Sequence, residues 1–305
     1  MINAVIAFSI LVSQNPTYSE RQIDNPKLKS NLRLAGPLHR SDHHLLVSND
    51  GRTVFSYGST LDRYSLTSPW AREGEVMVIY KVDGRRTSYT MSQSFYTQKY
   101  LTGTYKIGGR QLLAGIGKSD IWLWSYDDSG TYLSYVRMDK RGRRPNDDYK
   151  FPFRMDYIYQ DARLADGRLS IFVVRDVSGS RYLDTYLLKS RKMARADRTK
   201  LSKDAHPIAH DPKTRRLAGI IGVRRGVVLS HPASGARKST GPWVDARYFF
   251  TRGKLYRQGD GPLMEFNGKS WAPHAGITFI GKSANDRYWL LQRDDGTVWL
   301  RTYRN

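Results

Sequence analysis

Short apolar runs alternate with polar, glycine-containing turns along most of the chain. Residues 169–174 and 182–188, for example, are apolar and aromatic runs on either side of a Val-Ser-Gly turn. Runs of about four to eight such residues, bounded by Gly, Asn, Asp or Ser, are typical of β-strands joined by tight turns. The pattern recurs six times, at turns that contain Gly84, Gly130, Gly179, Gly235, Gly268 and Gly296.

The spacing of these glycines averages about 42 residues, which is the repeat length of a β-propeller blade. The pattern therefore predicts an all-β chain that forms a single β-propeller over residues 43–305, with six blades and seven as the alternative. Residues 14–42 are polar and rich in turns. We predict that they form a leader or supply a closing strand to the last blade.

Several turns carry a shared phrase that opens a repeat. Asp-Gly-Arg occurs at residues 50–52 and 166–168, and Asp211 begins a related phrase in the fourth repeat. Gly-Lys-Ser occurs at both 117–119 and 281–283. These phrases resemble the repeats of bacterial propellers of the TolB and WD40-like type, across about residues 44–305. The resemblance implies a fold and no particular activity.

Composition narrows the chemistry. Cys is absent, which excludes disulfides, thiolate metal sites and Cys nucleophiles. Of the 28 carboxylates, 24 are Asp, a residue that favours turns over helices. Residues 276–283 match the P-loop pattern G-x-x-x-x-G-K-[ST], but the interior is Ile-Thr-Phe-Ile, a strand sequence. We predict a strand and a turn there, and no bound cofactor.

The first residues include an apolar run, 4–12, that is too short to span a bilayer and has the length of a signal-peptide core. No Lys or Arg precedes it, so a buried first strand is the alternative. We predict a signal peptide at residues 1–13 and a secreted or periplasmic protein, with a cytoplasmic one as the alternative.

The net charge of +22 predicts attraction to polyanions. Residues 137–238 hold 25 of the 50 Lys and Arg residues against 11 Asp and no Glu. Two clusters interrupt the strand pattern there: residues 138–150 read as a charged loop, and residues 189–203 as a short amphipathic helix or a long loop. The candidate polyanion-binding residues in them are Arg141, Arg143, Arg144, Arg191, Lys192 and Arg195.

Catalytic and metal-binding patterns are weak. His206 and His210 lie beside Asp204 and Asp211, but Pro207 and Pro212 disfavour the helix that would align them, so we predict no metal site. A pair of opposed carboxylates could serve glycoside hydrolysis. The Asp residues outside obvious turns are Asp62, Asp156, Asp184 and Asp245, of which Asp62 and Asp245 are the candidates for a propeller mouth.

These observations predict a non-enzymatic, exported propeller that binds a protein, a glycan or another polyanionic partner. The alternative is a glycan-active hydrolase or lyase with Asp and Tyr residues in the propeller funnel. No catalytic residue is assigned, and no nucleic-acid-binding motif or transmembrane segment is recognised in the sequence.

Overall fold

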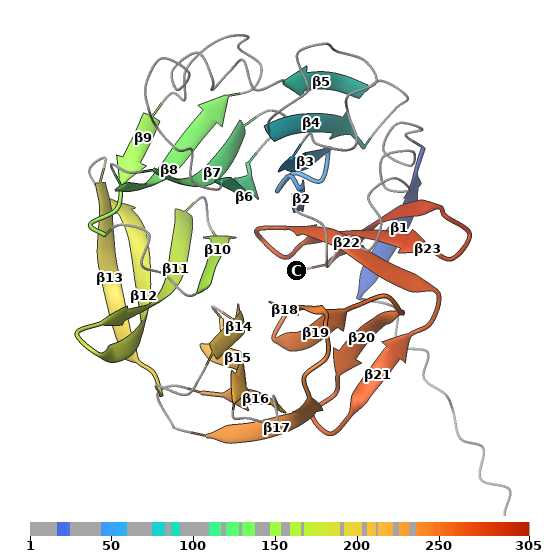
Figure 1. Cartoon of the computed structure of the whole chain (residues 1–305). Helices are drawn as coiled ribbons and strands as arrows, with labels where there is room; N and C mark the ends of the chain where they lie inside the picture. The colour runs from blue at the N-terminus through green and yellow to red at the C-terminus, as the bar shows by residue number, and fades with distance from the viewer. Residues whose placement is uncertain are drawn as a thin grey trace, which may run out of the picture.

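In the computed structural model, every regular element of the described residues is a β-strand (Figure 1). The structure describes residues 17–24, 44–59, 75–82, 87–91, 110–116, 120–127, 130–137, 147–153, 159–165, 168–189, 192–202, 206–211, 213–221, 226–231 and 236–304. Among these residues, no helix has the length and apolar character that crossing a bilayer requires.

The strands form antiparallel sheets of four in chain order. Four sheets are separate, and their strands are β6 (Arg110–Gly115), β7 (Asp120–Asp127), β8 (Gly130–Arg137) and β9 (Asp147–Lys150); β10 (Tyr159–Ala165), β11 (Arg168–Val177), β12 (Ser180–Lys189) and β13 (Lys192–Lys200); β14 (His206–Asp211), β15 (Arg216–Ile221), β16 (Gly226–Ser230) and β17 (Arg237–Pro242); and β18 (Arg247–Thr251), β19 (Lys254–Gln258), β20 (Leu263–Phe266) and β21 (Trp271–His274).

The two ends of the chain share one sheet of eight strands. Its order is β1-β24-β23-β22-β2-β3-β4-β5. The N-terminal strands are β1 (Tyr18–Ile23), β2 (His44–Val47), β3 (Thr53–Ser59), β4 (Glu75–Lys81) and β5 (Thr87–Met91), and the C-terminal ones are β22 (Ile277–Ser283), β23 (Tyr288–Arg293) and β24 (Val298–Tyr303). All pairs are antiparallel except β2 with β22, which run parallel.

The sheets stand around a common axis, with β2, β6, β10, β14, β18 and β22 nearest the centre (Figure 1). This arrangement of radial antiparallel sheets is a β-propeller. The predicted all-β propeller fold is therefore confirmed. The predicted runs fall on the strands: residues 169–174 lie in β11, and residues 182–188 lie in β12.

Apolar side chains pack between neighbouring sheets. In one cluster, Phe249 stacks on Phe279 with ring centroids 4.1 Å apart, and Trp289 meets Phe279 edge-on at 5.5 Å. Trp289 is fully buried. Because each sheet is too small to bury its own faces, this packing against the next sheet stabilises the ring.

The first described strand lies beside the last one. β1 pairs with β24 over six residues, from Tyr18 opposite Tyr303 to Ile23 opposite Val298. Glu20 on β1 accepts hydrogen bonds from Arg301 and Arg293, each at 2.7 Å. The backbone of Arg304 also donates to the Thr17 carbonyl at 3.0 Å. The ring is thus closed by a strand from one end of the chain added to three from the other.

The turn between β22 and β23 crosses toward the far side of the axis. The Leu164 amide on β10 donates to the Ala284 carbonyl at 3.2 Å, although the sheets of β10 and β22 are not neighbours in the ring. Ala284 is buried in the apolar cluster that contains Leu133, Phe151 and Leu164. This turn therefore fills part of the centre of the ring.

Three sequence predictions are corrected. Residues 138–150 are not a loop throughout, because residues 147–150 form β9, which pairs with β8. Residues 189–203 are neither a helix nor a long loop, because residues 192–200 form β13, the outer strand that pairs with β12 and buries Met193. The glycines used to count repeats also sit at unequal positions. Gly179 and Gly296 follow second strands, whereas Gly268 follows a third strand. The mean spacing of about 42 residues is thus an average over unequal intervals between two kinds of turn.

Candidate functional site

The turns that follow the innermost strands share one construction. After β2, the amide of Arg52 donates to the Asp50 carboxylate at 3.0 Å, and the amide of Thr53 donates to the Ser48 hydroxyl at 3.0 Å. The turn after β22 has the equivalent bonds. The amide of Arg287 donates to the Asn285 side-chain oxygen at 3.1 Å, and the amide of Tyr288 donates to the Ser283 hydroxyl at 3.0 Å. In each turn the short polar side chain thus binds its own turn, and an exposed Arg lies two positions after it, Arg52 after Asp50 and Arg287 after Asn285.

These turns lie on one face of the ring. Within an antiparallel sheet, the turn between the first and second strands and the turn between the third and fourth strands are at the same edge. Hydrogen bonds also join separate turns. Asn285 donates to Asn49 at 3.1 Å between two turns of the eight-stranded sheet, and the Arg216 guanidinium donates to the Gly253 carbonyl of another sheet. The ends of the first strands therefore point the same way.

This face is strongly cationic, and we call it the basic face. Its exposed cations lie in, or directly beside, turns of these two kinds, and they are Arg52, Arg168, Lys189, Lys192, Lys213, Arg215, Arg237, Lys238, Arg252, Lys269 and Arg287. Arg52, Arg168 and Arg287 form no ion pair with any described residue. The exposed carboxylate of Asp50 is occupied by its own turn.

The opposite face has a different charge. Its turns join second to third strands and carry the exposed carboxylates of Asp176, Asp260, Asp294 and Asp295. Asp245, just before β18, is exposed at the same end. The exposed cations Lys150, Lys200, Arg247 and Arg293 also lie at this end, so the opposite face is mixed in charge, whereas the basic face is mainly cationic.

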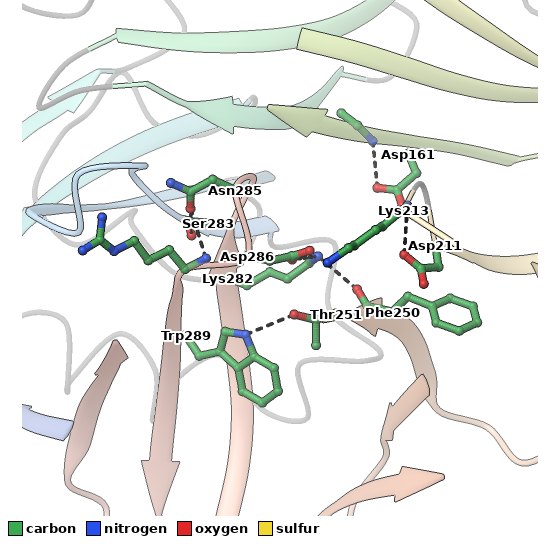
Figure 2. Close-up of polar contacts among 12 residues, drawn as sticks. Asp161, Asp211, Lys213, Phe250, Thr251, Lys282, Ser283, Asn285, Asp286 and Trp289 are labelled. Carbon is green, nitrogen blue, oxygen red and sulfur yellow. Dashed lines mark hydrogen bonds and ion pairs between the residues drawn. The ribbon is translucent and has the colours of Figure 1, made fainter. Parts of the chain in front are cut away.

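A second polar group lies near the axis (Figure 2). The Lys282 ammonium donates to the Phe250 carbonyl at 3.0 Å and is paired with Asp286. Asp161 faces this group from β10, and its carboxylate accepts a bond from the Tyr159 hydroxyl at 3.4 Å. Lys282 and Asp286 thus come from β22 and the turn after it, whereas Asp161 and Tyr159 come from β10 in another sheet.

Burial shifts the pKa values of two side chains, Asp161 and His210. Burial raises the pKa of Asp161 to about 6, although the nearby Lys282 charge acts in the opposite direction. Burial lowers the pKa of His210 to about 4. The His210 ring packs against Phe172 at a tilt, with centroids 4.7 Å apart, and its Nδ1 has no hydrogen-bond partner among the described residues. His210 is therefore a neutral core residue at pH 7.

His206 and His210 both lie on β14. His206 is exposed and His210 is buried, so the two rings do not share one environment. No group of three or more His, Cys, Asp or Glu side chains among the described residues could hold a metal ion.

The predicted polyanion-binding residues are only partly placed. Arg141, Arg143, Arg144 and Arg191 lie outside the described residues. Lys192 is exposed at the start of β13, on the basic face, and Arg195 is exposed along the same outer strand. The structure thus brings Lys192 together with turn residues that the sequence analysis did not select.

The structure also distinguishes the candidate carboxylates. Asp184 is fully buried, and burial opposes its ionisation, but hydrogen bonds from Arg198 and Arg175 outweigh that effect and lower its pKa. It is a structural ion-pair residue. Asp62 and Asp156 lie outside the described residues, and Asp245 is on the face opposite the basic turns.

The P-loop-like segment is a strand followed by a turn, as predicted. Residues Ile277–Ser283 form β22. A Cβ on Gly281 would lie 2.6 Å from the Leu45 carbonyl oxygen, so Gly281 permits the close approach of β22 to β2. Lys282 and Ser283 are held by Asp286 and Asn285 in the turn.

Sequence reasoning missed Arg52, Arg168 and Arg287 as surface residues of one site. Their signal was present, because each follows or lies within a turn after a first strand. In the sequence alone, these repeated turns predict the fold and do not indicate a binding surface. Recognising the shared face required the strand directions, which the sequence does not state.

No family model matches the chain, and no curated protein matches it. Solved propellers resemble its shape. TolB from Acinetobacter baumannii is 12% identical with a TM-score of 0.44, covering 84% of this chain, which spans 64% of that protein's length. A structure described as YCF48 bound to D1 peptide is 11% identical with a TM-score of 0.43, covering 96% of both chains. The predicted resemblance to bacterial propeller repeats is confirmed for the fold alone.

Proposed function

We propose that the chain is a non-enzymatic binding protein whose basic face takes a polyanionic partner. One observation carries the proposal: exposed cations from several sheets gather on one face, and three of them, Arg52, Arg168 and Arg287, form no ion pair with a described residue. Cations that only solubilise a surface are usually mixed with carboxylates. Here the exposed turn carboxylates lie largely on the other face.

The predicted cluster residues fit the same proposal. Arg141, Arg143 and Arg144 lie in the connection between β8 and β9, and Arg191 lies in that between β12 and β13. Both connections join third and fourth strands, the kind of turn that lies on the basic face. We propose that these residues, with Lys192 and Arg195, extend the cationic surface outward.

Binding of a polyanion by this face should depend steeply on salt. Each cation that neutralises an anionic group releases a counterion, so the affinity falls as ionic strength rises. The test is elution of the full-length chain from a sulfated-polysaccharide resin along a salt gradient. We expect Arg52→Gln with Arg287→Gln to elute at clearly lower salt than the unmodified chain.

A matched control removes two cations elsewhere. Lys150 and Lys200 are exposed at the ends of fourth strands, on the opposite face. Lys150→Gln with Lys200→Gln lowers the net charge equally, and we expect a much smaller shift in elution. Equal shifts in both variants would mean that binding follows net charge, and the proposal of a binding face would be wrong.

We further propose six blades. The parallel contact between β2 and β22 spans two residue pairs, whereas the antiparallel pairs around it are longer. The eight-stranded sheet then counts as two blades, β2-β5 and β22-β24 with β1. An experimental density map that showed a further four-stranded sheet in the ring would contradict this count.

The domain boundaries and the compartment are also proposals. We propose that residues 1–13 are a signal peptide, that residues 14–42 are a leader that contributes β1, and that residues 43–305 are the propeller. The exported chain would be secreted or periplasmic. Mass spectrometry of the N-terminus tests this, because cleavage near Ser13 is expected on export, and an intact Met1 on exported protein would contradict it.

A glycan-active hydrolase or lyase is the second candidate function. It is favoured by Asp161, a carboxyl group near the axis with a pKa raised to about 6 and a Tyr159 hydroxyl beside it. An ionisable acid with a pKa near neutrality suits proton transfer. If turnover were found in a screen of acidic and neutral glycans, Asp161→Asn should abolish it; turnover unaffected by Asp161→Asn would exclude this site.

A further inference from the structure

Polar side chains gather near the axis at the face opposite the basic one. β10 begins at Tyr159 and β18 begins at Arg247, and both strands are among the innermost of the ring (Figure 1). Because the first strands all point the same way, their first residues lie at the opposite face. Asp161 lies two residues further along β10, and β14 contacts both strands. Residues from two sheets therefore meet at this end of the axis.

Arg247 is a cation without an anionic partner. Its side chain is exposed, and its guanidinium forms no ion pair or hydrogen bond with a described residue. Burial nevertheless lowers the pKa of Arg247, and the nearby Asp161 carboxylate acts in the opposite direction. A side chain that water reaches while protein surrounds it lies in a concave part of the surface. The donors of Arg247 are therefore available to a ligand in a partly enclosed place.

The carboxylate of Asp161 also keeps free positions. Its Oδ1 accepts a hydrogen bond from the Ala162 amide at 2.7 Å, and its Oδ2 accepts one from the Tyr159 hydroxyl at 3.4 Å. A carboxylate offers about four acceptor positions, so two more bonds are possible. Asp161 is half-buried and remains within reach of solvent. Free donors on one side chain and free acceptors on the other thus lie near each other.

The charges near the axis favour a ligand with one negative charge. Lys282, the other cation that acts on Asp161, is already paired with Asp286. Arg247 alone is left to bind an anionic group. A single guanidinium matches a planar carboxylate through two parallel hydrogen bonds, whereas the two charges of a phosphate group would be only half neutralised by it.

From this geometry we propose that the axial end at the opposite face binds a small hydroxy acid that carries one carboxylate. Arg247 binds the carboxylate of the ligand, and Asp161 accepts a hydrogen bond from a neighbouring hydroxyl, while Tyr159 holds Asp161 in position. Sugar acids are simple ligands of this kind, because hydroxyl groups surround their single carboxylate. The inference goes beyond the basic face, and it stands whether or not Asp161 also transfers a proton.

Calorimetric titration of the full-length chain tests this with three sugars that share one ring and differ only at the exocyclic carbon. They are glucose, glucuronate and glucose 6-phosphate. We expect glucuronate to bind at least about tenfold more tightly than either of the others, because hydrogen bonds between charged groups are stronger than neutral ones. Arg247→Gln should reduce the affinity for glucuronate to that for glucose. Lys200→Gln removes an exposed cation of the same face from an outer strand, and it should change the affinity less than about twofold.

The hydroxyl side of the site has its own variant. Tyr159→Phe removes only the hydroxyl that donates to Asp161, and we expect it to weaken glucuronate binding about two- to tenfold. Because Arg247 makes no hydrogen bond to a described residue, Arg247→Gln should leave thermal unfolding unchanged, so a loss of binding is not a loss of folding. The proposal is wrong if glucuronate does not bind, if glucose 6-phosphate binds equally well, or if Arg247→Gln binds glucuronate as the unmodified chain does.

The sulfated resin separates this inference from the proposed function. Arg247 lies away from the basic face, so Arg247→Gln should elute close to the unmodified chain, at higher salt than Arg52→Gln with Arg287→Gln. If glucuronate fails to bind while elution still depends on the basic face, the axial site is wrong and the binding face stands. If glucuronate binds through Arg247 while the basic-face variant elutes unchanged, the reverse holds.

Discussion

Replacement of Glu20 tests how the ring is closed. Glu20 on β1 accepts bonds from two arginines on the C-terminal strands, Arg301 and Arg293. The side chain of Arg301 is 5% exposed, and that of Arg293 is 42% exposed. Glu20→Gln therefore leaves one buried guanidinium and one well-solvated guanidinium without their carboxylate.

The two losses differ in size. Removing one partner of a buried ion pair costs about 3–5 kcal/mol, whereas an exposed pair contributes about 0–1 kcal/mol. Arg301 keeps its 3.5 Å bond to the Tyr303 hydroxyl, and its guanidinium stays 4.2 Å from the Tyr18 ring centroid and 5.8 Å from that of Trp289. We therefore expect Glu20→Gln to lower the free energy of unfolding by about 2–4 kcal/mol.

Urea and thermal unfolding, followed by tryptophan fluorescence, measure this change. Trp289 is fully buried and lies 5.8 Å from the Arg301 guanidinium, so it is one of the seven tryptophans whose emission changes when this part of the ring opens. The midpoint temperature should fall by roughly 4–10 °C. Arg293→Gln is the matched control, with an expected cost below about 1 kcal/mol.

The reasoning is refuted if Glu20→Gln and Arg293→Gln cost the same, because the burial of Arg301 would then have no consequence. A second variant separates charge from packing. Glu20→Leu combined with Arg301→Met replaces the pair by apolar side chains, and such replacements are often neutral or stabilising. The double variant should therefore be more stable than Glu20→Gln alone.

Three further changes have defined outcomes. Gly281→Ala should cost about 1–3 kcal/mol by pushing β22 away from the Leu45 carbonyl, whereas Gly261→Ala, with no atom within 4 Å of the added Cβ, should cost less than about 0.5 kcal/mol in urea unfolding. The pKa of His210 in the folded state is about 4, below its ordinary 6.5, so the folded state binds fewer protons than the unfolded state and loses stability as the pH falls from 6.5 toward 4. The free energy of unfolding of His210→Phe should therefore fall less between pH 7 and pH 4.5 than that of the unmodified chain. The pH dependence that Asp161 contributes has the opposite sign. Its pKa is raised from 3.8 to about 6, so the folded state loses stability as the pH rises through that range. Asp161→Asn should abolish this loss, and an unchanged pH profile of the free energy of unfolding would contradict the pKa assignment.

The strands could be predicted because their signal is local. Apolar runs and turn-forming Asp, Asn and Gly recur at short range, and residues 169–174 and 182–188 fall on β11 and β12 as expected. The prediction for residues 189–203 was wrong because an outer strand needs few apolar residues. β13 buries Met193 and otherwise presents polar side chains, a pattern that also suits a loop or a helix.

The candidate site could not be predicted in the same way because it depends on distant pairs. Asn285 binds Asn49 from 236 residues away, and that contact helps to show that two Arg-bearing turns share a face. Similarly, Asp161 and Lys282 approach the axis from separate sheets. Local sequence patterns contain no information on which turns meet, so the candidate residues were chosen from runs of charge.

Closure by β1 sets an order of events during synthesis. Glu20 is made early and its partner Arg301 comes 281 residues later. At roughly 5–20 residues per second, the strand waits on the order of 15–60 s for the neighbour it will pair with. During that interval β1 lacks the strand with which it pairs, and the ring becomes complete only after β24 has left the ribosome.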